Sequence, residues 1–151
     1  MRVEESIIID RPPEEVFGFI SVRTNDAVWM ASVTESEWLD PAAPIGVGRR
    51  GRMVIKAMGG REFLDEVTEY EPGRRIAHRS VAGPMAIHSA CIAEPAGNGC
   101  RATVVYEPQR LPGGMVGRLT APLTAKIVRR NFRADLARLK DILETQTTAA
   151  Q

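Results

Sequence analysis

Two ionisable residues, Asp65 and His78, have types and spacing suited to acid–base chemistry. Both lie in segments where apolar and polar residues alternate, a pattern typical of β-strands. The residues Glu-Pro-Gly-Arg at 71–74 suit a type II turn, and counting outward from it places Val67 opposite His78. Asp65 then lies diagonal to His78, at roughly 7–8 Å, which two side chains can bridge. A histidine beside a carboxylate in an apolar cavity could act as a general acid or base, for example in enolisation or dehydration.

The same residues allow a second interpretation. Asp65 could instead pair with an arginine, while His78 caps a cavity wall or sits at the cavity mouth. The sequence leaves both alternatives open, so His78 and Asp65 are only candidates for catalysis. The chain has two histidines and no clustered ligand spacing, and we therefore expect no metal site and no other cofactor.

The hairpin that carries Asp65 can be given a register from its loop and its charges. A three-residue loop at Met58-Gly59-Gly60 would place opposite charges together on one face of the hairpin. The pairs predicted by this register are Lys56–Glu62, Val54–Leu64, Arg52–Glu66, Ile55–Phe63 and Met53–Asp65. Because side chains alternate between the two faces of a strand, a slip of one residue would invert the assignment.

The face opposite the charges is expected to line a cavity. Aromatic residues make up 5% of the chain, and small residues such as Ser80, Ser89 and Cys91 occupy inward positions, which favours a hollow over tight packing. Trp29 could gate the mouth of this cavity or pack in the core. The residues predicted to contact a ligand are Met53, Ile55, Phe63, Val67, Ile76, His78, Ser80, Ile87, Ser89, Tyr106 and Trp29.

The remaining elements follow in a simple order. We expect a strand at 3–9, short helices at about 14–20 and 25–30, strands from 34 to 107, and a long segment with helical periodicity that Gly113-Gly114 opens and that runs to Leu143, ahead of a frayed tail at 145–151. The helical pattern is clearest from about Thr124 onward. Consecutive strands with segregated helices indicate an α+β domain with an antiparallel sheet. Pro122 argues against a regular helix before it.

Polar residues interrupt the apolar stripe of the last helix. Asn131 or Asp135 could face the cavity, although a position at the helix flank toward water explains Asp135 more simply. The nearby residues Arg129, Arg130 and Arg133 are expected to form a solvated face, with weak contact to a membrane surface as the alternative.

Composition excludes several classes of protein. The 151 residues fit one domain, and a net charge of +1 argues against a nucleic-acid binder. No apolar stretch is long enough for stable membrane insertion, and the N-terminus has no apolar signal core. Cys91 and Cys100 are expected to be free thiols, which suits a reducing, cytoplasmic setting. We expect a monomer or homodimer.

Four segments resemble the START-like, or SRPBCC, superfamily, and most closely its polyketide cyclase/dehydrase-like branch. They are residues 5–17, Gly46-Val47-Gly48 leading into a strand, residues 66–76 and residues 94–103. The resemblance implies a single domain over residues 1–144 with a helix-grip fold, in which a curved seven-stranded antiparallel sheet wraps around a long C-terminal helix, with two short helices after the first strand and a cavity in between. It also implies a range of functions that includes lipid carriers and aromatase/cyclases.

Three functions are therefore open. The first is the binding of an apolar small molecule, such as a lipid or polyketide, by a carrier or sequestering protein. The second is a cyclase/dehydratase-like enzyme, a lyase without metal or nucleotide cofactor, that uses the same cavity. The third is a protein-interaction module.

Overall fold

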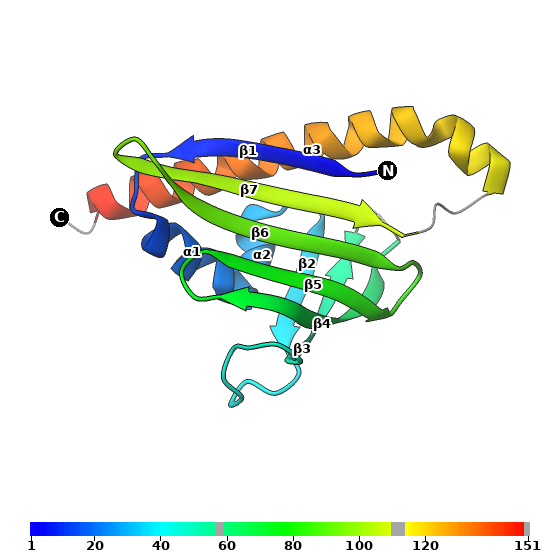
Figure 1. Ribbon diagram of the computed structural model, residues 1–151, viewed down its shortest axis with the longest axis horizontal. Coiled ribbons are helices and arrows are strands. Elements are labelled where there is room, and N and C mark those ends of the chain that lie inside the picture. The colour runs from blue at the N-terminus through cyan, green and yellow to red at the C-terminus, as the bar shows by residue number, and fades with distance from the viewer. Residues whose placement is uncertain (57–58, 110–113, 150–151) are drawn as a thin grey trace.

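The middle of the chain folds into one curved antiparallel sheet, because its apolar and polar residues alternate through successive hairpins. The computed structural model describes residues 1–56, 59–109 and 114–149. The strands are β1 (Val3–Ile9), β2 (Val33–Trp38), β3 (Arg50–Ile55), β4 (Arg61–Glu71), β5 (Arg75–Ala82), β6 (Ile87–Ala96) and β7 (Gly99–Pro108). Their order across the sheet is β1-β7-β6-β5-β4-β3-β2 (Figure 1). The expected seven-stranded sheet is confirmed.

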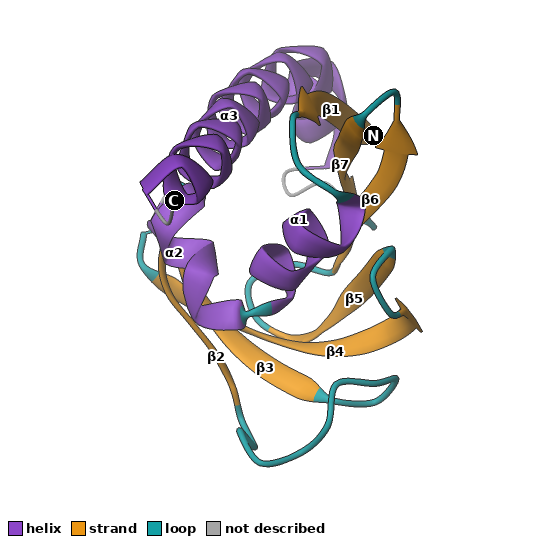
Figure 2. Cartoon of the chain, turned by 90° about the vertical axis from the view of Figure 1, so that its left-hand side faces the viewer, coloured by secondary structure: helices purple, strands orange, loops and turns teal. Residues whose placement is uncertain are grey.

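The helices lie on one side of this sheet. They are α1 (Pro13–Ser21), the 3₁₀ turn η1 (Arg23–Asn25), α2 (Asp26–Trp29) and α3 (Gly114–Ala149). Figure 2 shows α3 running along the open side of the curled sheet, with α1 and α2 filling one end. The α+β helix-grip fold, with its short helices after the first strand, is thus confirmed.

The long helix α3 packs on the sheet only through its C-terminal half. Leu136, Leu139 and Leu143 are buried at spacings of three and four, as an amphipathic helix requires. The helix begins at Gly114, where the helical periodicity was expected to start, and it continues through Pro122, which was expected to disturb it. Proline leaves one carbonyl of the preceding turn without a partner, but Pro122 is exposed, so water can satisfy this carbonyl. The helix continues beyond residue 144, and fraying at 145–151 stays a prediction.

Each central strand contributes one end to a packed core and the other end to a hollow. Ala93 of β6 and Cys100 and Ala102 of β7 are buried in the core beneath α1. Further along the same strands, Ser89 and Tyr106 line a cavity. The packed core therefore sits at the α1 end of the sheet.

The predicted register is confirmed for one hairpin and wrong for the other. Val67 lies opposite His78 and Asp65 opposite Ser80, as predicted. Nearer the turn Glu71 pairs with Arg75, and a bulge between Val67 and Glu69 restores the predicted pairing. Between β3 and β4 the register differs by two residues. The observed pairs are Ile55–Arg61, Val54–Glu62, Met53–Phe63, Arg52–Leu64, Gly51–Asp65 and Arg50–Glu66.

The reason for this difference is the length of the loop. Ile55 and Arg61 form the last pair, so the loop has five residues instead of three, and both Gly59 and Gly60 adopt positive φ. Met58, the first residue of the predicted loop, lies outside the described residues. A shift of two residues keeps every side chain on its face, so the predicted inner and outer faces survive. Arg52 was predicted to pair with Glu66 but instead contacts Glu62, with Arg52 Nε 2.8 Å from Glu62 Oε2. Glu66 pairs with Arg50.

Candidate functional site

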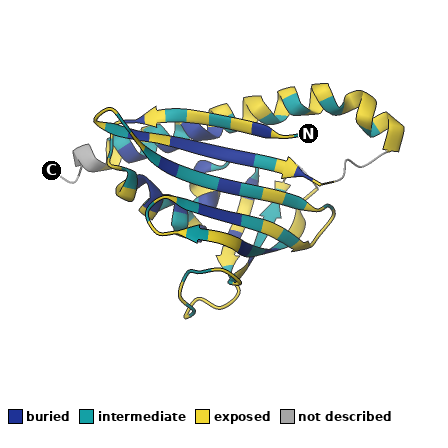
Figure 3. Ribbon diagram, viewed as in Figure 1, coloured by how far each residue is buried: buried dark blue, intermediate teal, exposed yellow. Residues whose placement is uncertain are grey.

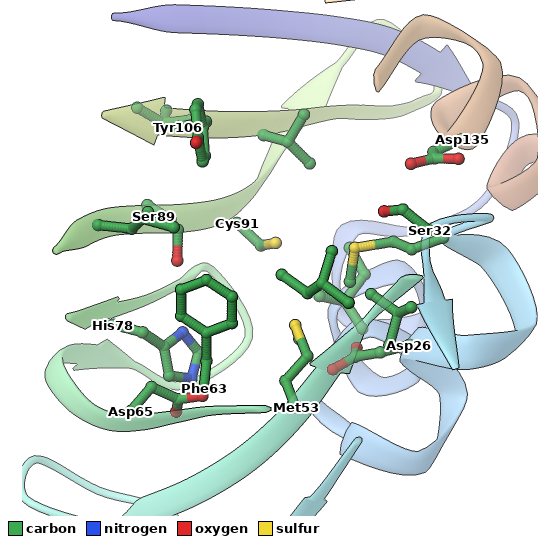
Figure 4. Close-up of a pocket in the computed structure, with 18 of the residues that line it drawn as sticks. Asp26, Ser32, Met53, Phe63, Asp65, His78, Ser89, Cys91, Tyr106 and Asp135 are labelled. Atoms are coloured by element: carbon green, nitrogen blue, oxygen red, sulfur yellow. The ribbon is translucent and has the colours of Figure 1, made fainter. Parts of the chain in front are cut away.

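A cavity of about 320 Å³ lies between the inner face of the sheet, the α2–β2 segment and α3 (Figure 4). This is the liquid volume of about ten water molecules, and ligand pockets range from about 300 to 1,000 Å³. Most of the lining side chains are apolar. The lining residues that were predicted from the sequence are Met53, Ile55, Phe63, Ile76, His78, Ser80, Ile87, Ser89, Tyr106 and Trp29.

Val67 does not lie where the prediction placed it. Its side chain is fully buried in the packed core with Phe17 of α1, and it is not part of the cavity wall. The inner face of the sheet was correctly assigned, but Val67 lies in the part of that face that packs in the core.

Asp65 is held by a buried arginine instead of the histidine. Arg23 Nη1 donates to Asp65 Oδ1 at 2.7 Å, and Arg23 Nη2 donates to Asp65 Oδ2. Both residues are buried. This two-pronged geometry neutralises the carboxylate and occupies both of its oxygens. The alternative in which Asp65 pairs with an arginine is confirmed, and the described contacts include no hydrogen bond between Asp65 and His78.

His78 is poorly suited to take up a proton. Burial lowers the pKa of its imidazole to about 4, and the nearby charge of Asp65 only partly opposes this. The ring centroid lies 6.3 Å from that of Trp38, at an interplanar angle of 32°. Its buried Nε2 has no hydrogen-bond partner among the described residues. At neutral pH His78 is an uncharged part of the wall.

Asp26 extends the buried polar network. Ser36 Oγ accepts from Arg23 Nε at 3.0 Å and donates to Asp26 Oδ2 at 2.7 Å. Burial raises the pKa of Asp26 to about 7, while the hydrogen bond from Ser36 and the charge of Arg23 limit the rise. Asp26 therefore exchanges its proton near neutral pH, the range that suits a general acid or base.

Arg23, Asp26 and Ser36 were not predicted from the sequence, although Gly51 carries a signal for them. Gly51 lies on the inner face of β3 and pairs with Asp65. A Cβ atom at Gly51 would lie 2.6 Å from the Arg23 guanidinium, so only glycine leaves room for it. The register error placed Met53 opposite Asp65 and concealed this clue.

Trp38 also lines the cavity and was not predicted as a site residue. The guanidinium carbons of Arg23 and Arg49 lie 5.1 Å and 4.2 Å from its ring centroid. Such cation–π contacts favour the charged guanidinium groups where water is scarce. Trp38 thus packs against the buried polar network of Arg23, Asp26, Ser36 and Asp65, which we call the polar base of the cavity.

Of the two polar residues on α3, the structure buries the one expected to face water. Asp135 is buried and accepts hydrogen bonds from the Ala31 N–H at 3.1 Å and from Arg138 at 3.2 Å. Burial raises its pKa. Asn131 is exposed and lines the cavity, as does Arg79 of β5. These two exposed residues mark where the cavity reaches solvent.

Some polar atoms of the wall remain for a ligand, beside the unpartnered Nε2 of His78 and indole N–H of Trp29. The hydroxyl of Ser80 donates to the Met85 carbonyl and accepts from the Ile87 N–H, so it is satisfied within its own hairpin. Among the described residues, the hydroxyls of Ser89 and Tyr106 have no hydrogen-bond partner. Burial raises the pKa of Tyr106, which keeps its phenol protonated. Figure 4 shows both residues in the cavity wall.

Other kinds of chemistry find little support in the described residues. No three His, Cys, Asp or Glu side chains gather there as metal ligands would. Cys91 and Cys100 are free, as expected. Burial raises the pKa of Cys91 to about 12, so its thiol is a poor nucleophile near neutral pH. No helix in the described part of the chain combines the length and the apolar composition needed to cross a bilayer.

Comparison with known proteins gives the same architecture. Residues 1–144 match the family described as polyketide cyclase / dehydrase and lipid transport. No protein with a curated description matches the sequence. The structure is similar to that of TTHA0849 from Thermus thermophilus, with a TM-score of 0.79 and 23% identity over 97% of this chain and 99% of the other.

Two aromatase/cyclases have the same fold. The Zhui aromatase/cyclase from Streptomyces sp. R1128 superposes with a TM-score of 0.79 and 16% identity, over 99% of this chain and 97% of the other. The di-domain aromatase/cyclase BexL of the BE-7585A biosynthetic pathway gives 0.70 and 19%, over 95% of this chain and 46% of the other. At these identities the similarity establishes the fold.

The close approach of Arg23 to Gly51 leads to a test of the buried ion pair. Gly51→Ala should displace the guanidinium from Asp65 and lower the free energy of unfolding by about 3 kcal/mol, because it leaves a buried charge without its partner. Urea denaturation measures this loss. Gly46→Ala is the matched control, because a Cβ there meets no atom within 4 Å. Equal stability of the two variants would contradict the assigned role of Gly51.

The raised pKa of Asp26 predicts a stability difference that depends on pH. Between pH 4 and 7 folded Asp26 keeps a proton that the unfolded chain releases, so the folded state loses stability as the pH rises through this range. Asp26→Asn removes this loss, and its unfolding free energy relative to the wild type should increase by up to about 4 kcal/mol from pH 4 to pH 8.

Urea denaturation at both pH values checks this prediction. His78 acts in the opposite direction, because its lowered pKa adds stability as the pH rises from about 4 to 6.5. It is present in both proteins, so its contribution cancels in the comparison. A difference between Asp26→Asn and the wild type that stays constant with pH would show that Asp26 titrates normally.

Proposed function

The chain belongs to the polyketide cyclase/dehydrase and lipid transport family, and from this premise we propose that it binds an apolar small molecule in its cavity as a carrier or sequestering protein. The observation that carries the proposal is the combination of an apolar wall with buried charges that are already paired. Phe63, Met53 and Ile55 supply wall that a hydrocarbon ligand can cover, and burial of such surface stabilises a complex.

The electrostatics of the wall favour an uncharged ligand. Arg23 and Asp65 neutralise each other, and His78 is uncharged near neutral pH. A ligand carboxylate or phosphate would find no free buried cation in the described wall, and its desolvation would be costly. The hydroxyls of Ser89 and Tyr106 can orient an oxygen atom of the ligand. We therefore propose a mainly hydrocarbon ligand that carries one or two carbonyl or hydroxyl groups.

The partially protonated carboxyl of Asp26 supports a second candidate function, a cyclase/dehydratase-like reaction in the same cavity. In such a reaction Asp26 would exchange a proton with the ligand, since its pKa of about 7 suits either direction of transfer. His78 has a lowered pKa and Asp65 is tied to Arg23, so neither supports this function as well. A role as a protein-interaction module stays a third possibility without an observation in its favour at the cavity.

Several earlier expectations stay predictions. A reducing, cytoplasmic setting is consistent with two free thiols. A monomeric or homodimeric state and the absence of nucleic-acid partners are two further predictions. None of these expectations is needed for the binding function.

Filling the cavity should abolish binding. The neutral fluorescent probe N-phenyl-1-naphthylamine should bind the wild type, and Ser89→Phe should weaken its affinity at least tenfold by occupying the volume that the probe needs. His88→Phe is the matched control, because His88 is the neighbouring residue on the exposed face of β6. Fluorescence titration measures both affinities. If the two variants bind alike, the probe does not enter this cavity and the proposal fails.

Turnover separates the carrier from the enzyme. Native mass spectrometry of protein purified from its own host would identify the retained ligand, and this ligand is then incubated with the wild type, Asp26→Asn and His78→Ala. A carrier leaves the ligand unchanged in all three incubations. An enzyme that uses Asp26 converts it in the wild type and His78→Ala, and at least 100-fold more slowly in Asp26→Asn, because general acid–base groups contribute about 10²–10⁴-fold. Unchanged turnover in Asp26→Asn would remove this residue from the mechanism.

A further inference from the structure

The N-terminal half of α3 carries an apolar stripe that the described part of the chain leaves exposed. Met115, Val116, Leu119, Leu123 and Ile127 are between 53% and 83% exposed. Four of them repeat at intervals of four residues, so they form one continuous strip along the helix. Figure 1 shows this part of α3 extending past the ends of β1 and β7, and Figure 3 shows that most of it is exposed.

The stripe lies on the side of the helix that faces away from the core. At 3.6 residues per turn, the positions from Leu119 to Ile127 fall roughly opposite those of Leu136, Leu139 and Leu143, which pack on the sheet. The helix therefore changes its apolar face partway along. The C-terminal apolar face packs in the core of the domain, whereas the N-terminal stripe has no partner among the described residues.

The segment that carries this stripe is positively charged. Residues 114–134 contain five basic side chains and no Asp or Glu, although the whole chain has a net charge of only +1. Arg133 pairs with Glu5 at 3.0 Å. The other four have no ion-pair partner within the described residues and are exposed. They are Arg118, Lys126, Arg129 and Arg130.

We propose that the N-terminal half of α3 docks on an anionic lipid bilayer surface. An exposed apolar strip bordered by unpaired Lys and Arg is the arrangement with which amphipathic helices lie in the interface of a membrane, and anionic headgroups attract the basic residues. A nucleic acid would satisfy the charges but leave the apolar strip in water. A second copy of the chain would cover the strip but would bring like charges together.

The docking surface lies close to the opening of the cavity. Ile127, the last residue of the stripe, is followed on the same helix by Val128 and Asn131, which line the cavity. Asn131 is also exposed, so the place where the cavity reaches solvent is close to the docking surface. A ligand could then pass between bilayer and cavity with little exposure to water. This consequence rests on the proposed function, whereas the docking itself does not.

Vesicle sedimentation tests the docking. The full chain is mixed with phosphatidylcholine vesicles that contain either no anionic lipid or 30% phosphatidylglycerol. We expect it to sediment with the anionic vesicles only, and to be released as sodium chloride rises from 0.1 to 0.5 M, because salt screens the attraction. Leu119→Gln/Leu123→Gln should lower the partition coefficient at least tenfold. Leu39→Gln/Val47→Gln, which alters exposed apolar residues elsewhere, is the matched control and should bind like the wild type.

Two further measurements make the outcome decisive. The Leu119→Gln/Leu123→Gln variant should bind N-phenyl-1-naphthylamine as the wild type does, since neither residue lines the cavity; this keeps a failure of docking distinct from a failure of the cavity. Sedimentation equilibrium should show the same mass for both proteins. Vesicle binding that the variant retains, or a wild-type dimer that the variant abolishes, would overturn the proposal, the latter because a second copy would then cover the stripe.

Discussion

The buried pair of Arg23 and Asp65 joins parts of the chain that are 42 residues apart. It ties the turn between the short helices to the middle of the sheet, and Ser36 of β2 and Asp26 of α2 are bonded into the same network. A buried charge without a partner is strongly destabilising, so these elements must hold their positions together. This network holds the cavity end of the curled sheet in place through polar contacts instead of apolar packing. A cavity can therefore persist beside the buried polar network.

This arrangement separates the polar groups that maintain the cavity from those that can meet a ligand. The charged groups satisfy one another, and Trp38 packs against two of the guanidinium groups. Ser89 and Tyr106 stay available at the wall. The described part of the wall therefore offers a ligand mainly hydrogen bonds, and it includes a carboxyl, that of Asp26, whose pKa burial raises to about 7.

Alternation along the strands predicted an antiparallel α+β domain and most of the cavity wall, whereas the helix-grip arrangement was implied by the resemblance to the SRPBCC superfamily. The alternation assigned each residue to a face, and the assignment survived a register error in β3–β4 because the error was an even number of residues. The polar base was not predictable in the same way, because Arg23 comes from a short turn with no periodicity of its own. Asp135 lines the cavity, which was one of its two predicted positions, but its burial was not predictable for a related reason. Its partner Ala31 offers a backbone N–H, which any residue except proline would supply.

Trp29 and Trp38 are the chain's two tryptophans, and both line the cavity. The intrinsic tryptophan fluorescence of the protein consequently arises from two side chains that a bound ligand would contact. Trp38 stands beside two guanidinium groups and an imidazole, and Trp29 is fully buried with its indole N–H unbonded among the described residues. The two indoles thus have distinct surroundings, one polar and one apolar, and occupancy of the cavity can be followed from intrinsic fluorescence without a label.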